Sequence, residues 1–402
     1  MINASAEKRT ANLTLIKWLT FLMFMMFAMT TDSVGVIIPE IMKQYNLSMT
    51  SAGMFHYGPM IAIALSGMFL GFLADKLGRK KAIIIGLALF AANSYLFLAG
   101  STFYFFLTLL IVSGIAIGIF KTGALALIGD ITQSPKEHTT TMNAVEGFFG
   151  VGAIVGPFIV AYLLKHGTDW KWLYIIAASL CIVLITIALL VKYPSSTKQN
   201  TESVDIKSTF ALLKNPFALG FSLAAFMYVA VECSIYVWMP TLISSYKGDA
   251  IFFSTYALSI FFILRAGGRF LGAWILSKYD WSIVLTIFSL FIFICFLVSV
   301  IGGVNYAVFL LPLSGIFMSL IYPTINSKGI SCFPKNQHGS VAGIILFFTA
   351  AGAALGPLAI GAVSDLFNHN AAAGFVLATI FAGFLFTGFL YNWKYKLTDR
   401  TV

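Results

Sequence analysis

Twelve long apolar segments constrain the fold of this chain more than any other feature of its sequence. A helix needs about 20 apolar residues to cross a bilayer, and the chain supplies runs of that length repeatedly. They lie near residues 13–38, 51–74, 81–100, 103–127, 140–164, 172–191, 217–245, 251–276, 282–302, 305–330, 339–366 and 371–393. With 59% hydrophobic residues, 10% charged residues and a mean hydropathy of +0.91, a water-soluble fold is excluded. We therefore predict an all-α membrane protein with twelve transmembrane helices.

The basic residues indicate how these helices are oriented. If the N-terminus is cytoplasmic, the outer loops contain only Lys43, Lys165, Lys171 and Lys247, and most other Lys and Arg residues fall in cytoplasmic loops. This bias is typical of membrane proteins, so the net charge of +10 reflects topology and predicts no binding to nucleic acid. The first apolar run is too long for a cleaved signal peptide. We expect a multi-pass protein of the cytoplasmic (inner) membrane with both termini in the cytoplasm.

The chain is predicted to form two related six-helix halves. A polar interval, residues 193–215, separates an N-terminal half, 1–192, from a C-terminal half, 216–402, and is interpreted as a cytoplasmic linker. Motifs recur about 200 residues apart: Gly152, Gly156 and Pro157 return as Gly352, Gly356 and Pro357, and GMFLGFL from residue 67 corresponds to GRFLGAW from residue 268. Parallel repeats of this kind are a building principle of transporters.

The loop between the second and third segments, GFLADKLGRKK from Gly71 to Lys81, carries a specific pattern. Gly71 allows close helix approach, Gly78 permits a tight reversal, and Asp75 can hold Arg79 or a neighbouring helix end. Every position resembles the corresponding loop of the major facilitator superfamily. The resemblance implies a substrate site near mid-membrane between the halves, alternating access by rocking of the halves, and conformational gating by these four residues.

Two intramembrane acids are related by the internal repeat. Asp32 in the first segment and Glu232 in the seventh lie at similar depth, and ionisable residues within spans usually face a cavity or a partner. We expect both to face one cavity, with Asp32 carrying a proton and Glu232 contacting substrate. His56 lies at a depth from which it could reach Asp32, and such a pair would suit proton uptake and release. The alternative is that His56 only caps a helix end.

Three further charges lie within predicted spans. Lys121 and Glu146 each lie about seven residues from the cytoplasmic ends of their segments, and we expect them to form a buried pair, either static or part of a gate. Arg265, near the middle of the eighth segment, must find Glu232, another acid, backbone carbonyls or an anionic substrate group. Arg269 is expected to tie helix ends together.

Several motifs resemble one branch of the superfamily, the fucose, galactose or glucose to proton symporters. These are Asn143 with Glu146, Tyr228 with Glu232, GRFLGAWIL from residue 268, and FMSLIYPTINSKGI from residue 317. In this chain Glu146 replaces a typical glutamine, and Lys121 stands where some members have an acid. The resemblance and the cavity-lining helices that it implies give a substrate set of Lys121, Asn143, Tyr228, Glu232, Tyr236, Trp238, Arg265, Tyr322 and Asn326, and a proton-coupling set of Asp32, His56, Glu146 and Glu232.

We predict a proton-coupled symporter that imports a small polar solute, such as a sugar or sugar derivative. Its partners are the solute, protons and lipid, and we expect it to act as a monomer. The alternative is a proton-coupled exporter of drugs or organic ions, although Lys121 and Arg265 disfavour cationic cargo. Sodium coupling stays open because Thr30, Thr31 and Ser33 flank Asp32. No enzyme activity or cofactor is expected, and the four cysteines lie in apolar runs, which indicates neither disulfides nor a metal site.

Overall fold

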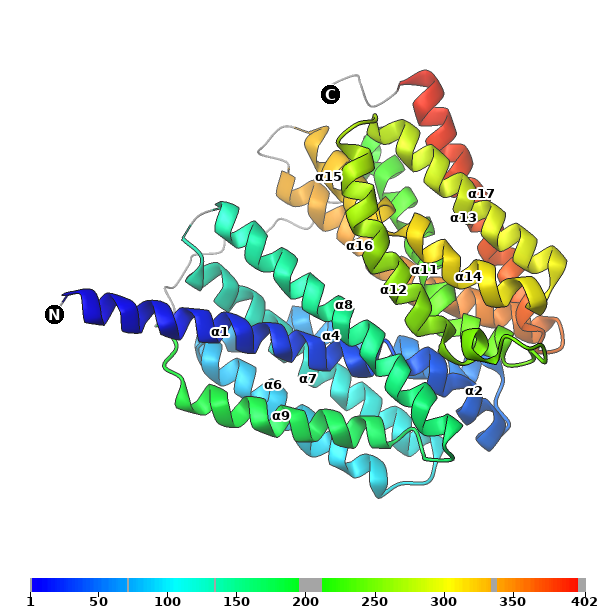
Figure 1. The fold of residues 1–402 in the computed structure, drawn as a ribbon. Coiled ribbons are helices and arrows are strands. Elements are labelled where there is room, and N and C mark those ends of the chain that lie inside the picture. The colour runs from blue at the N-terminus through cyan, green and yellow to red at the C-terminus, as the bar shows by residue number, and fades with distance from the viewer. Residues whose placement is uncertain (1, 71, 134, 195–211, 334–337, 397–402) are drawn as a thin grey trace. The chain divides into compact units, whose positions relative to one another are not determined.

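The computed structural model describes residues 2–70, 72–133, 135–194, 212–333 and 338–396, and this part of the chain is built from helices (Figure 1). Its residues cluster into two compact units. Unit 1 comprises residues 1–37 and 54–200, and unit 2 comprises residues 38–53 and 201–402. The assignment of residues 38–53 to the second unit has no counterpart in the sequence analysis.

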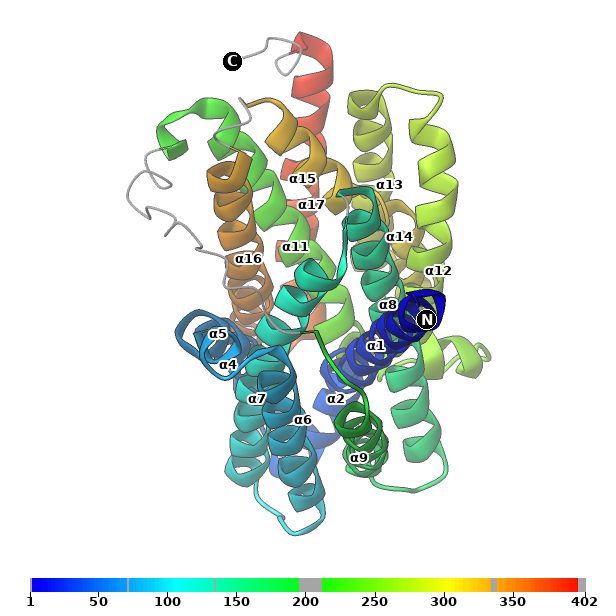
Figure 2. The ribbon, with the colours of Figure 1, turned by 90° about the vertical axis from the view of Figure 1, so that its left-hand side faces the viewer.

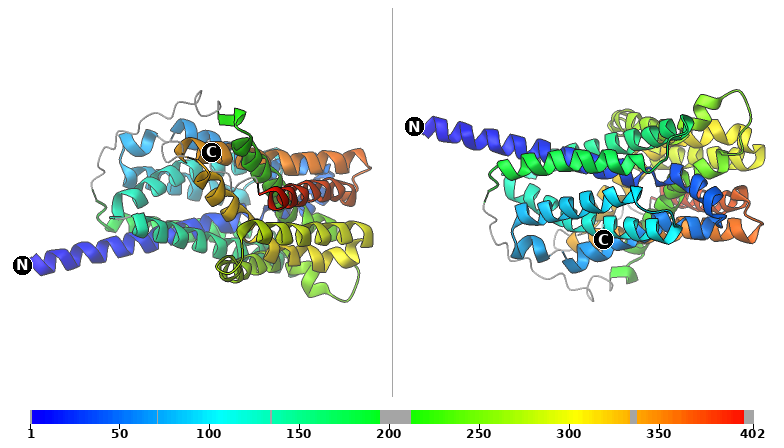
Figure 3. Two further views of the ribbon diagram at one scale, coloured as in Figure 1. Left: turned by 90° about the horizontal axis from the view of Figure 1, so that it is seen from above. Right: turned by 90° about the horizontal axis from the view of Figure 1, so that it is seen from below.

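Unit 1 is a bundle of long helices. They are α1 (Ile2–Thr31), the first turn of α2 (Val34–Tyr45), α4 (Met54–Leu70), α5 (Phe72–Lys76), α6 (Arg79–Tyr95) with the short η1 (Leu96–Leu98), α7 (Phe103–Ile131), α8 (Pro135–Lys165) and α9 (Trp172–Leu190). Helix α1 packs beside α8, as Figures 1 and 3 show, while α7 packs against both α4 and α6. Rings of Phe24, Phe27, Phe90 and Phe120 fill the centre.

Unit 2 repeats this plan. It holds the rest of α2, α3 (Met49–Ala52), η2 (Leu212–Lys214), α11 (Pro216–Ile243), α12 (Ile251–Leu276), α13 (Trp281–Gly302), α14 (Val304–Met318), α15 (Ile321–Ser331), α16 (His338–Leu366) and α17 (Ala371–Tyr395). Helix α11 packs against α16 and α17, α12 against α14, and α13 against α14 and α17 (Figure 2). Gly352 and Gly356 bring α16 onto the backbone of α11 near Phe226 and Ala230.

Eleven helices among the described residues are long and apolar enough to cross a membrane. The remaining expected span, residues 51–74, corresponds to α4 and α5, which flank Gly71; Gly71 itself lies outside the described residues. The count is therefore consistent with the twelve helices that the sequence predicts.

Two spans that the sequence analysis treats as continuous are interrupted. The first breaks at Asp32 and Ser33, between α1 and α2, and the tenth breaks at Ser319 and Leu320, between α14 and α15. At the first break Ser33 donates its hydroxyl proton to the Met29 carbonyl, and side chains that compete in this way for backbone carbonyls disturb a helix. At the second, Pro323 lacks the N–H that would continue the helix.

Helices α7 and α8 extend further than predicted, to Ile131 and from Pro135. The predicted ends followed the apolar runs, whereas both helices continue as polar turns. Lys121 therefore lies ten residues and Glu146 eleven residues from these ends, which is about 15 Å at 1.5 Å per residue. The predicted distance of seven residues was too short.

Candidate functional site

Glu232 is the centre of a buried polar cluster in unit 2. It is only 7% exposed, and its Oε1 lies 2.6 Å from Nη2 of Arg265 and 2.8 Å from the hydroxyl of Tyr228. Tyr228 and Glu232 are four residues apart on α11, so they share one helix face, and Arg265 comes from α12. Of the partners that the sequence left open for Arg265, the structure provides Glu232.

The helix break after α14 contributes a further group to this cluster. Helix α14 ends at Met318, and the Met318 carbonyl accepts a hydrogen bond of 2.8 Å from the Tyr228 hydroxyl. Carbonyls at the C-terminus of a helix lack an intrahelical partner. Tyr228 therefore joins the end of α14 to the carboxylate on α11.

The hydrogen-bonding groups of this cluster allow two states, one with Glu232 ionised and one with Glu232 protonated. Tyr228 has a single hydroxyl proton but faces two acceptors, the Glu232 carboxylate and the Met318 carbonyl. When Glu232 is ionised, the proton cannot fully satisfy both acceptors, and Arg265 compensates the carboxylate. When Glu232 is protonated, it can donate to Tyr228, which then donates to Met318. The geometry thus suits a carboxyl group that alternates between binding a proton and pairing with the Arg265 guanidinium.

The other side chains that the sequence singled out in unit 2 lie in different settings. Tyr322 is half-buried, with its ring 6.3 Å from that of Tyr228, so it belongs to the cluster. Asn326 is half-buried on α15. Tyr236 is half-buried, and its ring packs on Phe262.

Trp238 and Arg269 complete the unit 2 residues named from the sequence. Trp238 is fully buried, and its indole N–H donates to the Pro357 carbonyl at 2.9 Å, which suits a role in fixing α16 against α11. Arg269 is exposed.

Unit 1 holds the second group of charges. Asp32 lies at the break between α1 and α2, where the Thr31 hydroxyl donates to its Oδ2 at 3.0 Å. Lys121 on α7 is half-buried and interacts electrostatically with both Asp32 and Glu146. The exposed Asn143 lies on α8, the helix that carries Glu146.

The expected buried pair of Lys121 and Glu146 is wrong in its geometry. Glu146 is exposed, and no ion pair joins it to Lys121 in the part of the chain that the structure describes. The Lys121 ammonium instead lies 5.4 Å from the centre of the Phe149 ring, a cation–π contact. Phe149, one turn along α8 from Glu146, thus makes the contact with Lys121 that the sequence analysis expected from the Glu146 carboxylate.

His56 is buried, with 2% of its surface exposed, near the start of α4. It lines a small cavity in unit 1 together with Thr30 and Thr31, the residues that precede Asp32. His56 thus shares a cavity wall with the two threonines before the helix break, and its pairing with Asp32 stays a prediction.

The basic loop contains an ion pair that sequence reasoning missed. Gly78 has φ of 88°, which explains why glycine suits this turn before α6. Arg79 Nε lies 3.0 Å from Oδ2 of Asp130 near the end of α7, and these side chains are 10% and 7% exposed. The sequence signal that could have indicated this pair is Asp130, a single carboxylate at the end of an apolar run. Gly71 and the side chain of Asp75, also named as gating residues, lie outside the described residues.

Asp365 is a second carboxylate that the sequence analysis did not single out. Near the end of α16 it accepts hydrogen bonds of 2.8 Å from the backbone N–H groups of Met49 and Thr50 at the start of α3, and it lies 2.9 Å from Nδ1 of His369. This contact fixes the segment 38–53 on unit 2.

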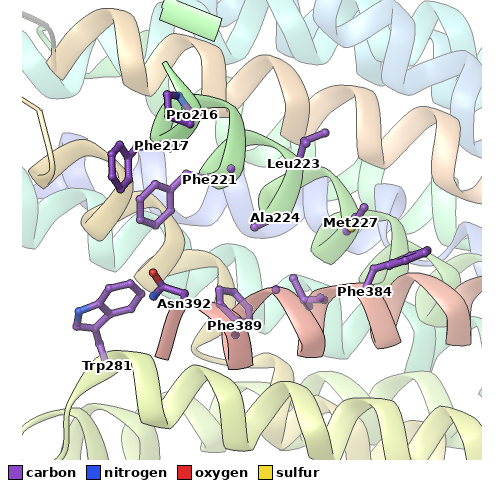
Figure 4. Close-up of a pocket in the computed structure, with 13 residues that line it drawn as sticks. Pro216, Phe217, Phe221, Leu223, Ala224, Met227, Trp281, Phe384, Phe389 and Asn392 are labelled. Carbon is purple, nitrogen blue, oxygen red and sulfur yellow. The ribbon is translucent and has the colours of Figure 1, made fainter. Parts of the chain in front are cut away.

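A pocket of about 300 Å³ in unit 2 is apolar (Figure 4). It lies between α11, the start of α13 and α17, and its lining includes Phe217, Phe221 and Phe389, with Trp281 and Asn392 as the side chains that bear polar groups. Such a lining suits hydrocarbon better than a sugar. The polar clusters around Glu232 and Asp32 are therefore the better candidates for solute and proton binding.

Comparisons with known proteins identify a family and several similar proteins. A sequence model described as Major Facilitator Superfamily matches residues 20–357. The quinolone resistance protein NorA of Staphylococcus aureus (strain COL) is 25% identical over 357 residues, which covers 83% of this chain and 86% of NorA.

Two solved transporter structures share the fold of this chain. The nucleoside transporter NupG superposes with a TM-score of 0.75 at 18% identity, covering 95% of this chain and 99% of NupG. A variant of the E. coli fucose:proton symporter FucP gives a TM-score of 0.62 at 19% identity, covering 94% of this chain and 99% of FucP. At these identities the likeness establishes the fold alone.

Proposed function

Because the chain belongs to the Major Facilitator Superfamily and is a transporter rather than an enzyme, we propose that it couples the import of a small polar solute to protons. The observation that carries this proposal is the Glu232 cluster, in which one buried carboxylate faces a guanidinium at 2.6 Å and a tyrosine hydroxyl at 2.8 Å. Buried ionisable groups within a membrane span are costly and mark ion or substrate pathways.

Protonation of Glu232 links proton binding to solute binding. The neutral carboxyl group donates to Tyr228, and Tyr228 donates to the Met318 carbonyl. Arg265 then loses its counter-charge, which is unfavourable within a membrane. A hydroxyl-rich or anionic solute relieves that cost by accepting hydrogen bonds from the guanidinium. Proton and solute thus favour each other, as symport requires.

The first half contributes a second polar set to the proposed solute path. Asp32 is the second proton-binding group, with Lys121 as its electrostatic neighbour. Asn143 on α8 and Asn326 on α15 are the proposed solute contacts outside the Glu232 cluster, and Glu146 on α8 is a further proposed proton-coupling residue. That Asp32 and Glu232 face one cavity remains a prediction.

A sugar or sugar derivative is the proposed solute. FucP, a fucose:proton symporter, shares the fold, as does the nucleoside transporter NupG. Hydroxyl groups of such solutes match the Tyr, Asn, Arg and carboxylate side chains of the two clusters, and their apolar ring faces match Tyr228 and Tyr322.

Export of drugs or organic ions is the second candidate function. It is favoured by the 25% identity to the quinolone resistance protein NorA over most of both chains. Against cationic cargo, the acid of each polar cluster has a basic neighbour: Arg265 pairs with Glu232, and Lys121 interacts with the half-buried Asp32. These basic groups leave less negative charge for an organic cation than unpaired acids would.

Flux measurements in proteoliposomes separate the two functions. Purified protein is reconstituted, and uptake of labelled fucose, a nucleoside, a sugar acid and a quinolone is measured with a pH gradient of either sign, with and without sodium. Import of a polar solute with the proton gradient supports the proposal. Quinolone movement in the direction opposite to proton flow, without movement of the polar solutes, favours the exporter.

The topology is proposed from the charge bias alone. We place the multi-pass protein in the cytoplasmic membrane as a monomer with both termini inside. Fusion of a reporter that works only in the periplasm to residue 402 should give no signal. A periplasmic signal would reverse the orientation.

A further inference from the structure

Two arginines on α12 give the Glu232 cluster an excess of positive charge. Arg265 and Arg269 are four residues apart, so they lie on one side of the helix, and both interact electrostatically with the buried Tyr228 hydroxyl. Glu232 is the acid that interacts with the same hydroxyl. Two guanidinium groups and one carboxylate leave one positive charge in excess when Glu232 is ionised.

Unit 1 does not share this excess. Its intramembrane ammonium group, on Lys121, already interacts with two acids, Asp32 and Glu146. An anionic group of the solute is therefore matched by the charges of unit 2 rather than by those of unit 1.

Arg269 lies on the packed side of α12, although its side chain is exposed. Beyond the kink at Tyr256, the large apolar side chains that α12 exposes are Ile263, Phe270, Leu271 and Trp274. At about 100° per residue, each lies at least about 100° around the helix from Arg269, whereas the buried Leu258 and Phe262 lie within about 20° of it. Arg269 is also seven residues, or about 10 Å, from the end of α12 at Leu276. A guanidinium in this position reaches water on the packed side of the helix rather than lipid.

Close helix packing fixes the backbone beside both arginines. A Cβ at Gly268 would lie 2.7 Å from the Ile316 carbonyl oxygen, and one at Gly315 would lie 3.2 Å from the Arg265 backbone nitrogen. Helices α12 and α14 are therefore in backbone contact next to the arginines. Side chains held on a fixed backbone lose less conformational entropy when they bind a ligand.

Charge balance favours a particular kind of solute. A proton on Glu232 and a monocarboxylate on the guanidinium groups together bring no net charge to the cluster, because the solute carboxylate replaces that of Glu232 as the partner of Arg265. A proton that binds together with a neutral sugar instead adds one positive charge within the membrane span, which is costly. The guanidinium fork also matches a carboxylate through two parallel hydrogen bonds.

We propose that Arg265 and Arg269 bind a carboxylate of the solute, so that the transported solute is a hydroxylated monocarboxylate, such as a sugar acid, rather than a neutral sugar. This inference rests on the proposed proton-coupled import, and it names the charge class of the solute at the same site. It gives Arg269 a place in the solute path instead of the role of tying helix ends that the sequence predicts. Asn326, half-buried on α15, is left for the hydroxyl groups of the solute.

Binding of matched solutes to the purified full-length protein tests the proposal. Each pair has a similar hydroxyl pattern and differs in charge: glucuronate with glucose, galacturonate with galactose, and gluconate with sorbitol. Glucose 6-phosphate tests a dianion. Affinity is measured in detergent by isothermal titration calorimetry, with solute concentrations up to tens of millimolar. At least one monocarboxylate should bind about tenfold or more tightly than its neutral counterpart.

Variants assign this binding to the arginines. Arg269→Gln should weaken binding of that carboxylate by about tenfold or more, while Arg269→Lys keeps the charge and should retain most of the affinity. Because Arg269 is exposed, its replacement should leave the fold intact. Glu232→Gln should bind the carboxylate more tightly than wild type, because no protein carboxylate then competes for Arg265. Lys278→Gln removes an exposed cation that packs on Trp274, and this matched control should bind like wild type.

Three results would overturn the proposal. They are the absence of binding by every monocarboxylate, binding of the neutral member of each pair with equal or higher affinity, and a carboxylate affinity that Arg269→Gln leaves unchanged. Binding of glucose 6-phosphate alone would overturn the assignment of a monocarboxylate.

Proteoliposome flux separates this inference from the proposed function. Proton-coupled uptake of a neutral sugar, with no carboxylate transported, overturns the inference and leaves the proposed function intact. Carboxylate binding that depends on Arg269, without any proton-coupled flux, supports the anion site and overturns the proposed function.

Discussion

Replacing Gly356 by alanine should separate α16 from α11 and destabilise unit 2. A Cβ at this position would lie 2.6 Å from both Cα and Cβ of Ala230, whereas ordinary contacts begin near 3.4 Å. The helices must therefore move apart by about 0.8 Å, because a backbone atom cannot rotate away as a side chain can.

The size of the effect follows from two opposing contributions. Overpacking of this kind costs about 1–3 kcal/mol, while alanine gains up to about 1 kcal/mol over glycine in a helix interior. The expected net loss is about 1–2 kcal/mol, which corresponds to a fall of roughly 2–8 °C in melting temperature for a unit of this size.

Gly220→Ala on α11 is the matched control. No atom lies within 4 Å of a Cβ built at Gly220, so this variant should melt at the wild-type temperature or a few degrees above it. Melting is followed in detergent by the loss of the monodisperse peak in size-exclusion chromatography. If Gly356→Ala melts like Gly220→Ala, the close approach of α16 to α11 is refuted.

Three further predictions concern the loop, the pH dependence and the first acid. Arg79→Gln should lower turnover far more than solute affinity, because its partner Asp130 lies nine residues along α7 from Lys121, about 13 Å at 1.5 Å per residue. Exposed Lys81→Gln is the control in a flux assay, and an equal loss of binding in Arg79→Gln would contradict this prediction. The hydrogen bond from the Lys17 ammonium lowers the pKa of Glu137, so this contact stabilises the protein above about pH 4.3, the usual glutamate pKa, and the stabilisation is lost as the pH falls below that value. The difference in melting temperature between wild type and Glu137→Gln should therefore shrink from pH 7 to pH 3. A constant difference would count against this prediction. Asp32→Asn should abolish uphill accumulation but preserve solute exchange, measured by counterflow, and intact accumulation would remove Asp32 from the proton path.

The sequence predicts well what depends on local composition. Apolar run length identifies the membrane helices, and the repeat of Gly152 and Gly156 as Gly352 and Gly356 identifies the two related bundles. Glu232 could be selected because an ionisable residue in an apolar run needs a partner, and the structure supplies Arg265.

What the sequence could not reveal depends on contacts between distant segments. The pairs of Arg79 with Asp130 and of Asp365 with the start of α3 join residues whose spacing follows no local period. The helix end at Met318 became informative only when Tyr228, on another helix, was placed against it. The length of α8 was underestimated because its first turns are polar and lie outside the apolar run.

The central claim is that Glu232 exchanges a proton as solute moves, and solute-induced pH change tests it most directly. Cells or vesicles that contain the protein are suspended in lightly buffered medium, a saturating pulse of each candidate solute is added, and external pH is recorded. Glu232→Gln is compared with wild type and with Asp169→Asn, a control that neutralises an exposed carboxylate paired with Lys171.

At least one polar solute should make the medium alkaline with wild-type protein and with Asp169→Asn, and the same pulse should give no pH change with Glu232→Gln. Solute uptake by wild-type protein without any pH change, or an undiminished pH change with Glu232→Gln, would contradict the claim.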